Sequence, residues 1–118
     1  HEAILNASTG FHTSQLVLGD RYGASCSPDI INNLAMLISK NGLHASRNIP
    51  FSGAYIVQKY GRPELNRHAI QLEIDRSMYM DEQKIQKLEK FFKLKNKLLN
   101  ILRDFSKTHT SITSIAAE

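Results

Sequence analysis

Residues 48–82 decide the fold and read NIPFSGAYIVQKYGRPELNRHAIQLEIDRSMYMDE. Within them, residues 68–76 alternate apolar and polar side chains, as a β-strand does. Gln71, Glu73 and Asp75 follow one another at two-residue spacing, so they are expected to point to one face of that strand. A carboxylate in a buried strand costs free energy unless another group pairs with it or the chemistry uses it. The alternation also fits an edge strand with a solvated polar face. The two-residue period alone does not distinguish this edge strand from a buried strand with a functional carboxylate.

The residues upstream predict a strand, a loop and a helix. Residues 15–19 form a short apolar run ended by Gly-Asp, which predicts a buried strand with residues 20–26 as a loop at its carboxyl end. Ser27 and Pro28 then open a helix, as N-cap and first helical residue, and Gly42 ends it. The apolar positions between them recur at helical spacing: Ile30, Ile31, Leu34, Leu37 and Ile38.

The residues downstream predict a strand at a sheet edge over 43–48, two turns of helix over 54–60, and a long helix over about 82–106 capped by Asp81. The long helix carries one broad apolar stripe, formed by Ile85, Leu88, Phe91, Phe92, Leu98, Leu99, Leu102 and Phe105. Such a stripe packs on a sheet or on another helix.

The order of these elements predicts an α/β fold with a mainly parallel sheet and a long C-terminal helix. Residues 1–14 contain few sizeable apolar side chains and are expected to form a flexible arm. Residues 15–106 form the domain, and residues 107–118, rich in Thr, Ser and Ala, are expected to form a tail.

Size and composition indicate one ordinary globular domain. The chain has 118 residues, of which 42% are hydrophobic and 22% charged. It contains no apolar run of about 18 residues, so we expect neither a transmembrane helix nor a membrane partner, and its first residues do not resemble a signal peptide. The single cysteine, Cys26, cannot form an internal disulfide, which fits a cytoplasmic location. Cys26 is a candidate nucleophile or, as we favour, a buried structural thiol.

Basic side chains crowd the predicted long helix. Such a stripe could attract nucleic acid, but no aromatic side chains alternate with the lysines to stack on bases. We therefore expect a solvated helix face and no nucleic-acid partner. The basic residues are Lys84, Lys87, Lys90, Lys93, Lys95, Lys97, Arg103 and Lys107.

Most of the chain, from about residue 15 to about residue 105, resembles the C-terminal portion of the N-formylglutamate amidohydrolase (N-formylglutamate deformylase) family. An upstream block supports the resemblance, and so do four blocks in residues 48–82. The upstream block is Leu18-Gly19-Asp20-x-x-Gly23-Ala24-Ser25-Cys26-x-Pro28. The four are Asn48-x-x-Phe51-x-Gly53-x-Tyr55-Ile56, Tyr60-Gly61-x-Pro63, His68-Ala69-Ile70-Gln71-Leu72-Glu73 and Tyr79-Met80-Asp81-Glu82.

The resemblance implies part of a three-layer sandwich similar to the zinc-carboxypeptidase-like (phosphorylase/hydrolase-like) fold. It also implies zinc-dependent hydrolysis of the N-formyl amide of N-formyl-L-glutamate to formate and glutamate, a late step of histidine degradation. In such chemistry Zn²⁺ activates a water molecule, a carboxylate carries the proton, and polar groups orient the substrate.

By position in the motif, Glu73 is the expected catalytic acid/base. Asn48, Arg62, His68 and Gln71 are the expected substrate-binding residues. For each of them the alternative is a local hydrogen bond or a loop-fixing role.

The family's zinc ligands have no counterpart here. A hydrolytic zinc site needs about three protein ligands, and the histidines His12, His44, His68 and His109 show no ligand-like spacing. His1 and Glu2 do not fit the family's later His-Ser block. Zinc is therefore expected in the complete family domain but not on this chain alone.

Three hypotheses follow. The first is an amidohydrolase fragment that needs an N-terminal partner chain to act on an N-formyl amino acid. The second is a non-catalytic remnant or self-associating interaction domain that forms a homo-oligomer. The third, ranked last, is a small basic nucleic-acid binder.

Overall fold

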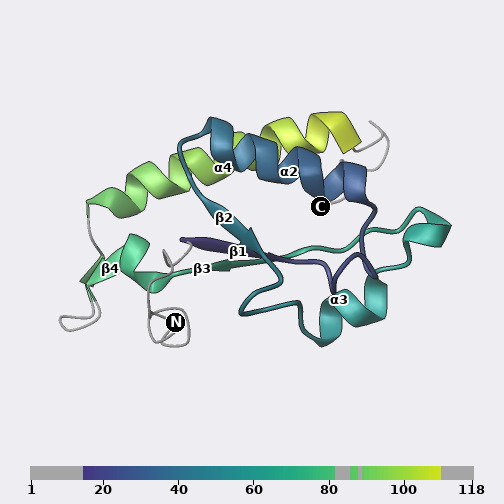
Figure 1. Cartoon of the computed structure of the whole chain (residues 1–118). Coiled ribbons are helices and arrows are strands. Elements are labelled where there is room, and N and C mark those ends of the chain that lie inside the picture. Colours follow the sequence, from purple (N-terminus) through teal and green to yellow (C-terminus); the bar gives the residue numbers. More distant parts are fainter. Residues whose placement is uncertain (1–14, 82–85, 88, 110–118) are drawn as a thin grey trace.

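A computed structural model describes residues 15–81, 86–87 and 89–109 (Figure 1). The predicted arm of residues 1–14 and most of the predicted tail lie outside the described residues. The elements are β1 (Leu16–Gly19), α2 (Pro28–Lys40), β2 (Ala45–Arg47), α3 (Tyr55–Tyr60), the 3₁₀ turn η1 (Pro63–Leu65), β3 (Gln71–Ile74), the 3₁₀ turn η2 (Arg76–Met78), β4 (Met80–Asp81), β5 (Gln86–Lys87) and α4 (Lys90–His109).

The main sheet is mixed, so the prediction of a mainly parallel sheet was wrong. Its strand order is β2-β1-β3, with β2 parallel to β1 and β3 antiparallel to β1. A parallel strand needs a crossover that carries the chain back along the sheet, as α2 does between β1 and β2. Between β2 and β3 the longest helix is α3, with 6 residues. The chain therefore stays at the carboxyl end of β2, and β3 runs back from there.

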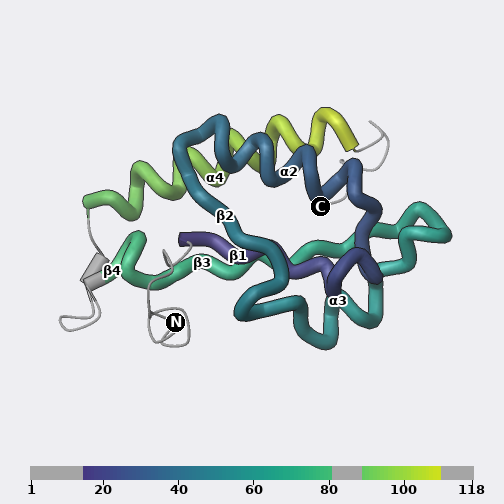
Figure 2. The backbone as a smooth tube through the Cα atoms, viewed as in Figure 1, coloured from purple at the N-terminus to yellow at the C-terminus, as the bar shows by residue number. Residues whose placement is uncertain are grey.

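Helices α2 and α4 lie side by side over one face of this sheet (Figures 1 and 2). They enclose the apolar core with alternate residues of the strands, since successive strand residues face opposite sides. Leu16 and Leu18 of β1 are fully buried in this core, and Leu72 and Ile74 of β3 pack against it. Residues 17, 19, 71 and 73 therefore face the other side of the sheet. The core residues are Leu16, Leu18, Cys26, Ile31, Leu34, Leu37, Ile38, Leu43, Leu94 and Ile101.

The predictions of β1, α2, β2 and α3 from the sequence are confirmed. Helix α2 begins at Pro28 after Ser27, whose backbone is extended although its hydroxyl makes no capping hydrogen bond. The chain leaves the helix through Gly42, whose φ of +76° lies in the left-handed region that glycine tolerates.

Helix α4 differs from its prediction at both ends. It begins at Lys90 rather than near residue 82, because Met80 and Asp81 pair with Lys87 and Gln86 in a second, two-stranded sheet. It continues to His109, so residues 107–109 of the predicted tail are helical.

The buried face of α4 also differs from the prediction. Leu94 and Ile101 are buried, whereas Phe92, Leu99 and Leu102 are exposed. Two stripes at seven-residue spacing, through residues 94 and 101 and through residues 92 and 99, run along the helix, and periodicity does not say which one faces the core.

Within the described residues, no helix is both long enough and apolar enough to cross a lipid bilayer.

Candidate functional site

Asn48 joins the carboxyl ends of β1 and β2. Its side-chain Oδ1 accepts hydrogen bonds from the backbone N–H of Asp20 (3.1 Å) and of Tyr22 (3.3 Å). Its Nδ2 donates to the Asp20 carboxylate at 2.9 Å. Asn48 and Asp20 are both buried. The amide thus holds the loop after β1 in one conformation, across a gap of 28 residues in sequence.

The backbone of this loop is strained. Arg21, Tyr22 and Asn48 have φ values of 54°, 55° and 62°, a region that costs non-glycine residues roughly 1–2 kcal/mol each. Strained residues cluster where the surrounding structure determines them, often at functional sites. Here the hydrogen bonds of Asn48 supply that constraint.

We predict that Asn48→Ala lowers the free energy of unfolding by about 3 kcal/mol, since buried N–H groups lose their acceptor and alanine is strained at positive φ. Urea denaturation measures the change. Asn48→Gly is the matched control, because it loses the same hydrogen bonds without the strain. It should unfold with about 1–2 kcal/mol more stability than Asn48→Ala. A wild-type midpoint for Asn48→Ala would contradict this role.

Glu73 is the only carboxylate on its strand, and its neighbour Gln71 holds it. Gln71 Oε1 accepts the backbone N–H of Ala54 at 2.7 Å, and Gln71 Nε2 donates to Glu73 Oε1. Glu73 is half-buried and lies opposite Val17 in the antiparallel register. Its side chain therefore projects from the sheet face opposite α2 and α4. Gln71 links the carboxylate to the segment that leads into α3.

The segment before α3 passes close over the end of β1. A Cβ added to Gly19 would lie 2.8 Å from the backbone N of Gly53, so only glycine permits this approach. The backbone N–H of Arg21 donates to Ser52 O at 2.7 Å. Since Gly19 is the register partner of Gln71, this crossing, the Asn48 loop and the Gln71–Glu73 pair lie at one end of the sheet.

Arg62 and His68 form their hydrogen bonds with residues other than Gln71 and Glu73. Arg62 Nη1 donates to the carbonyl oxygens of Gln58 (2.9 Å) and Gly61 (2.7 Å) at the end of α3. His68 Nδ1 accepts the N–H of Ser27 at 3.1 Å, and its Nε2 lies 3.0 Å from Asn66 Oδ1. The tautomer with the proton on Nε2 satisfies both contacts. These are the local roles considered above, and substrate binding by Arg62 or His68 stays a prediction.

Sequence reasoning missed Asp20 as a member of the site. Its side chain is buried and takes part in the Asn48 hydrogen bonds. A Gly-Asp pair directly after an apolar strand was the available signal, because the carboxyl ends of strands collect ligands in open α/β sheets.

Cys26 is a buried structural thiol, as favoured from the sequence. Its side chain is fully buried beside α2. Burial, and then the negative charge of Asp20, raise the pKa of this thiol to about 11. A thiol with such a pKa is a poor nucleophile at neutral pH.

We predict that Cys26 reacts with iodoacetamide at pH 8 at least about a hundredfold more slowly in the folded chain than in urea, because a two-unit rise in pKa lowers the thiolate fraction about a hundredfold. Mass spectrometry of timed samples measures the rate. Equal rates in both states would show an accessible thiol.

The described residues do not form a hydrolytic zinc site. In residues 15–81, 86–87 and 89–109, no three His, Cys, Asp or Glu side chains come together as metal ligands. Such a site needs about three protein ligands and one open position, so the donor set described here does not fit Zn²⁺. His1 and Glu2 lie outside the described residues.

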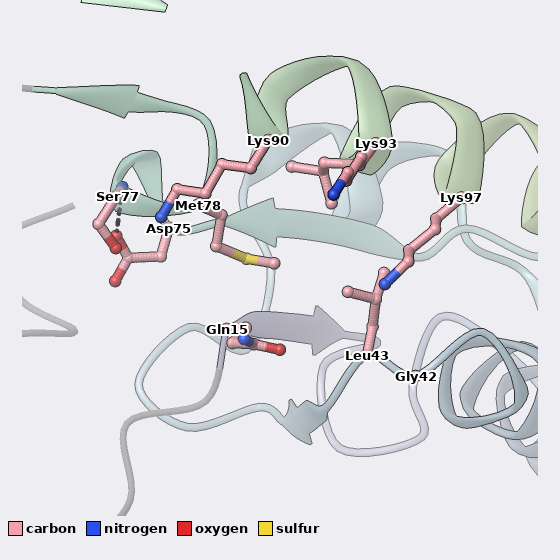
Figure 3. A pocket seen from close by; sticks show the side chains of 10 residues that line it. Gln15, Gly42, Leu43, Asp75, Ser77, Met78, Lys90, Lys93 and Lys97 are labelled. Carbon is pink, nitrogen blue, oxygen red and sulfur yellow. Dashed lines mark hydrogen bonds between the residues drawn. The ribbon is translucent and has the colours of Figure 1, made fainter. Parts of the chain in front are cut away.

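A hollow of about 350 Å³ lies at the other end of the sheet (Figure 3). Lys90, Lys93 and Lys97 of α4 point towards it, and Asp75 lies across from them. The Asp75 carboxylate already accepts the N–H of Ser77 at 2.8 Å and so caps η2. None of the described residues that line the hollow is aromatic, so these residues offer bases no stacking surface. The hollow is therefore part of the lysine-rich, solvated face of α4.

The sequence model of the N-formylglutamate amidohydrolase family matches residues 2–80 of the chain. An N-formylglutamate deformylase from Pseudomonas aeruginosa is 42% identical over 67 residues, which are 56% of this chain and 25% of that protein. Another from Pseudomonas putida is 38% identical over 66 residues, with 55% and 25% covered.

The fold is similar to the crystal structure of N-formylglutamate amidohydrolase from Ralstonia eutropha JMP134, with a TM-score of 0.77 and 31% identity. The match covers 87% of this chain and 37% of that one. The chain thus spans about a quarter of the length of the curated relatives, and about a third of the solved relative.

Proposed function

Because the chain belongs to the N-formylglutamate amidohydrolase family, we propose that it is one part of a hydrolase that cleaves the formyl amide of N-formyl-L-glutamate. The observation that carries this proposal is the placement of Glu73, whose carboxylate Gln71 holds on the sheet face away from the long helices. The names of the relatives support N-formyl-L-glutamate as the proposed substrate.

In the proposed reaction Glu73 accepts a proton from the water that attacks the formyl carbon. The carbon–nitrogen bond then breaks, and Glu73 passes the proton to the departing amine. The products are formate and glutamate, which places the reaction late in histidine degradation as the family resemblance implies. The hydrogen bond from Gln71 fixes the carboxylate in one orientation, and geometry of this kind supplies a large part of a hydrolytic rate.

Asn48 and Gln71 form the proposed polar wall beside Glu73. Both lie at the same end of the sheet, since the N–H of Asn48 donates to Leu18 O and Gln71 pairs with Gly19. Arg62 is the proposed partner of the side-chain carboxylate of N-formyl-L-glutamate. Its side chain is exposed, and within the described residues only its Nη1 is engaged. A guanidinium group matches a carboxylate through its remaining N–H donors.

We propose that this chain acts only together with the remaining portion of the family domain. Its described residues do not provide a zinc site, and the relatives are about four times its matched length. The zinc that the family resemblance implies would then take its ligands from outside the described residues. The complete domain would have the zinc-carboxypeptidase-like architecture.

Product identification tests the proposed substrate. The chain, combined with the N-terminal part of the Pseudomonas aeruginosa relative and supplied with zinc, should release ¹³C-formate from N-[¹³C]formyl-L-glutamate in an NMR assay. N-formylglycine, which lacks the second carboxylate, should react much more slowly because Arg62 then has no partner. Equal rates on both substrates would contradict the assignment of Arg62.

A further inference from the structure

One edge of β3 is unpaired among the described strands. The N–H of Asp75 donates to Gln15 O, and that of Ala69 donates to Ser25 O. Hydrogen-bonding positions alternate along an antiparallel pair, so Leu72 and Ile74 direct their backbone N–H and C=O groups away from β1. No described strand lies on that side. An unpaired strand edge is a template for another strand.

The side chains of these residues line an apolar groove against α4. Two hollows of about 310 and 400 Å³ run along the β3 edge. Both are lined by Leu98 and Leu102, and they join into one surface. We call this surface the β3 groove; its main residues are Ile70, Leu72, Ile74, Leu98, Leu99 and Leu102.

The β3 groove leaves large apolar side chains in water. Leu99 and Leu102 are each 52% exposed. An apolar surface beside an unpaired strand edge is typical of an interaction site. The opposite edge of the sheet differs, since β2 has only 3 residues and ends in the exposed Arg47. Short, charged edges resist pairing.

We propose that the β3 groove binds the remaining, N-terminal portion of an N-formylglutamate amidohydrolase domain by strand addition. The solved relative contains this fold within 37% of its length, so most of its chain lies outside the matched part and is available to cover this surface. The added strand bonds the backbone of Leu72 and Ile74 and places alternate apolar side chains on Leu99 and Leu102. This inference rests on the proposed function, because it takes the family domain as the occupant.

The probe is the part of the Pseudomonas aeruginosa deformylase that precedes its matched region, made as a separate chain. Titration calorimetry and native mass spectrometry should show a 1:1 complex. The double variant Leu99→Lys/Leu102→Lys should bind about 10–100-fold more weakly. Met36→Lys is the matched control, because Met36 is a similarly exposed residue of α2 (59%) outside the groove. Circular dichroism checks that both variants fold.

Hydrogen exchange locates the contact, and the Leu72 and Ile74 amides should become protected in the complex. Absence of a complex, both after mixing and after co-expression, would overturn the proposal, as would binding that the double variant leaves unchanged. Protection of the same amides by a dimer of this chain alone would identify a second copy as the occupant and also overturn it. A complex that the double variant weakens but that releases no formate would support the β3 groove as the docking site and would contradict the proposed function.

Discussion

Glu73→Gln is expected to lower the kcat of the reconstituted enzyme for N-formyl-L-glutamate by about 10²–10⁴-fold, the range that general acid–base groups contribute. Glutamine keeps the size of the side chain and an oxygen that can still accept from Gln71 Nε2. It cannot take up the proton of the attacking water. The KM should change little, because the substitution removes a group that acts during proton transfer rather than in ground-state binding.

Glu64→Gln is the control for this substitution. Glu64 is an exposed carboxylate on η1, so its loss changes charge by the same amount without touching the strand. Its kcat should equal that of the wild type. If Glu73→Gln retained kcat within about twofold, Glu73 would not be the proton carrier, and the carboxylate would be a structural partner of Gln71.

Gly61→Ala is expected to lower the free energy of unfolding by about 3 kcal/mol, at the upper end of the cost of overpacking a buried site. A Cβ at this position would lie 2.3 Å from Ser25 Cβ and 2.6 Å from Ser25 Cα. Ser25 has no room to give, because it is fully buried and its hydroxyl donates to Ala69 O at 3.0 Å. To relieve the clash, Ser25 in the loop after β1 has to move, and this weakens its contact with Ala69, which precedes β3.

Gly23→Ala separates this steric effect from backbone strain. Gly23 has a φ of +89°, and a Cβ added there would meet nothing within 4 Å. Its substitution should cost only the left-handed penalty of about 1–2 kcal/mol. Urea denaturation of both variants gives the comparison. Equal losses, or a smaller loss for Gly61→Ala, would show that the contact with Ser25 relaxes at little cost.

The elements that local chemistry controls were predictable. Ser27, Pro28 and Gly42 mark the ends of α2 by their own backbone preferences. The direction of β3 was not predictable. It depends on whether the chain between β2 and β3 crosses back to the other end of the sheet before β3 begins. The buried face of α4 was not predictable either, because two apolar stripes compete and only the position of α2 and the sheet selects Leu94 and Ile101.

The candidate site divides in the same way. The placement of Gln71 and Glu73 on one face follows from the strand period, and the structure brings the two side chains together. The contact of Asn48 with Asp20 spans 28 residues and depends on β1 and β2 lying side by side, which no local pattern reveals. His68 looks like a site residue in the motif, yet it lies beside Ile70 and Leu72 along the hollow next to α4, and its Nδ1 accepts the N–H of Ser27.

The most direct measurement is a titration of this chain into the N-terminal part of the Pseudomonas aeruginosa relative, with zinc present and formate release recorded. We predict no turnover by either component alone and a rate that rises until the two are equimolar. The Glu73→Gln chain should form the same complex and release almost no formate. Formate release by this chain alone, or by the Glu73→Gln complex at the wild-type rate, would contradict the account.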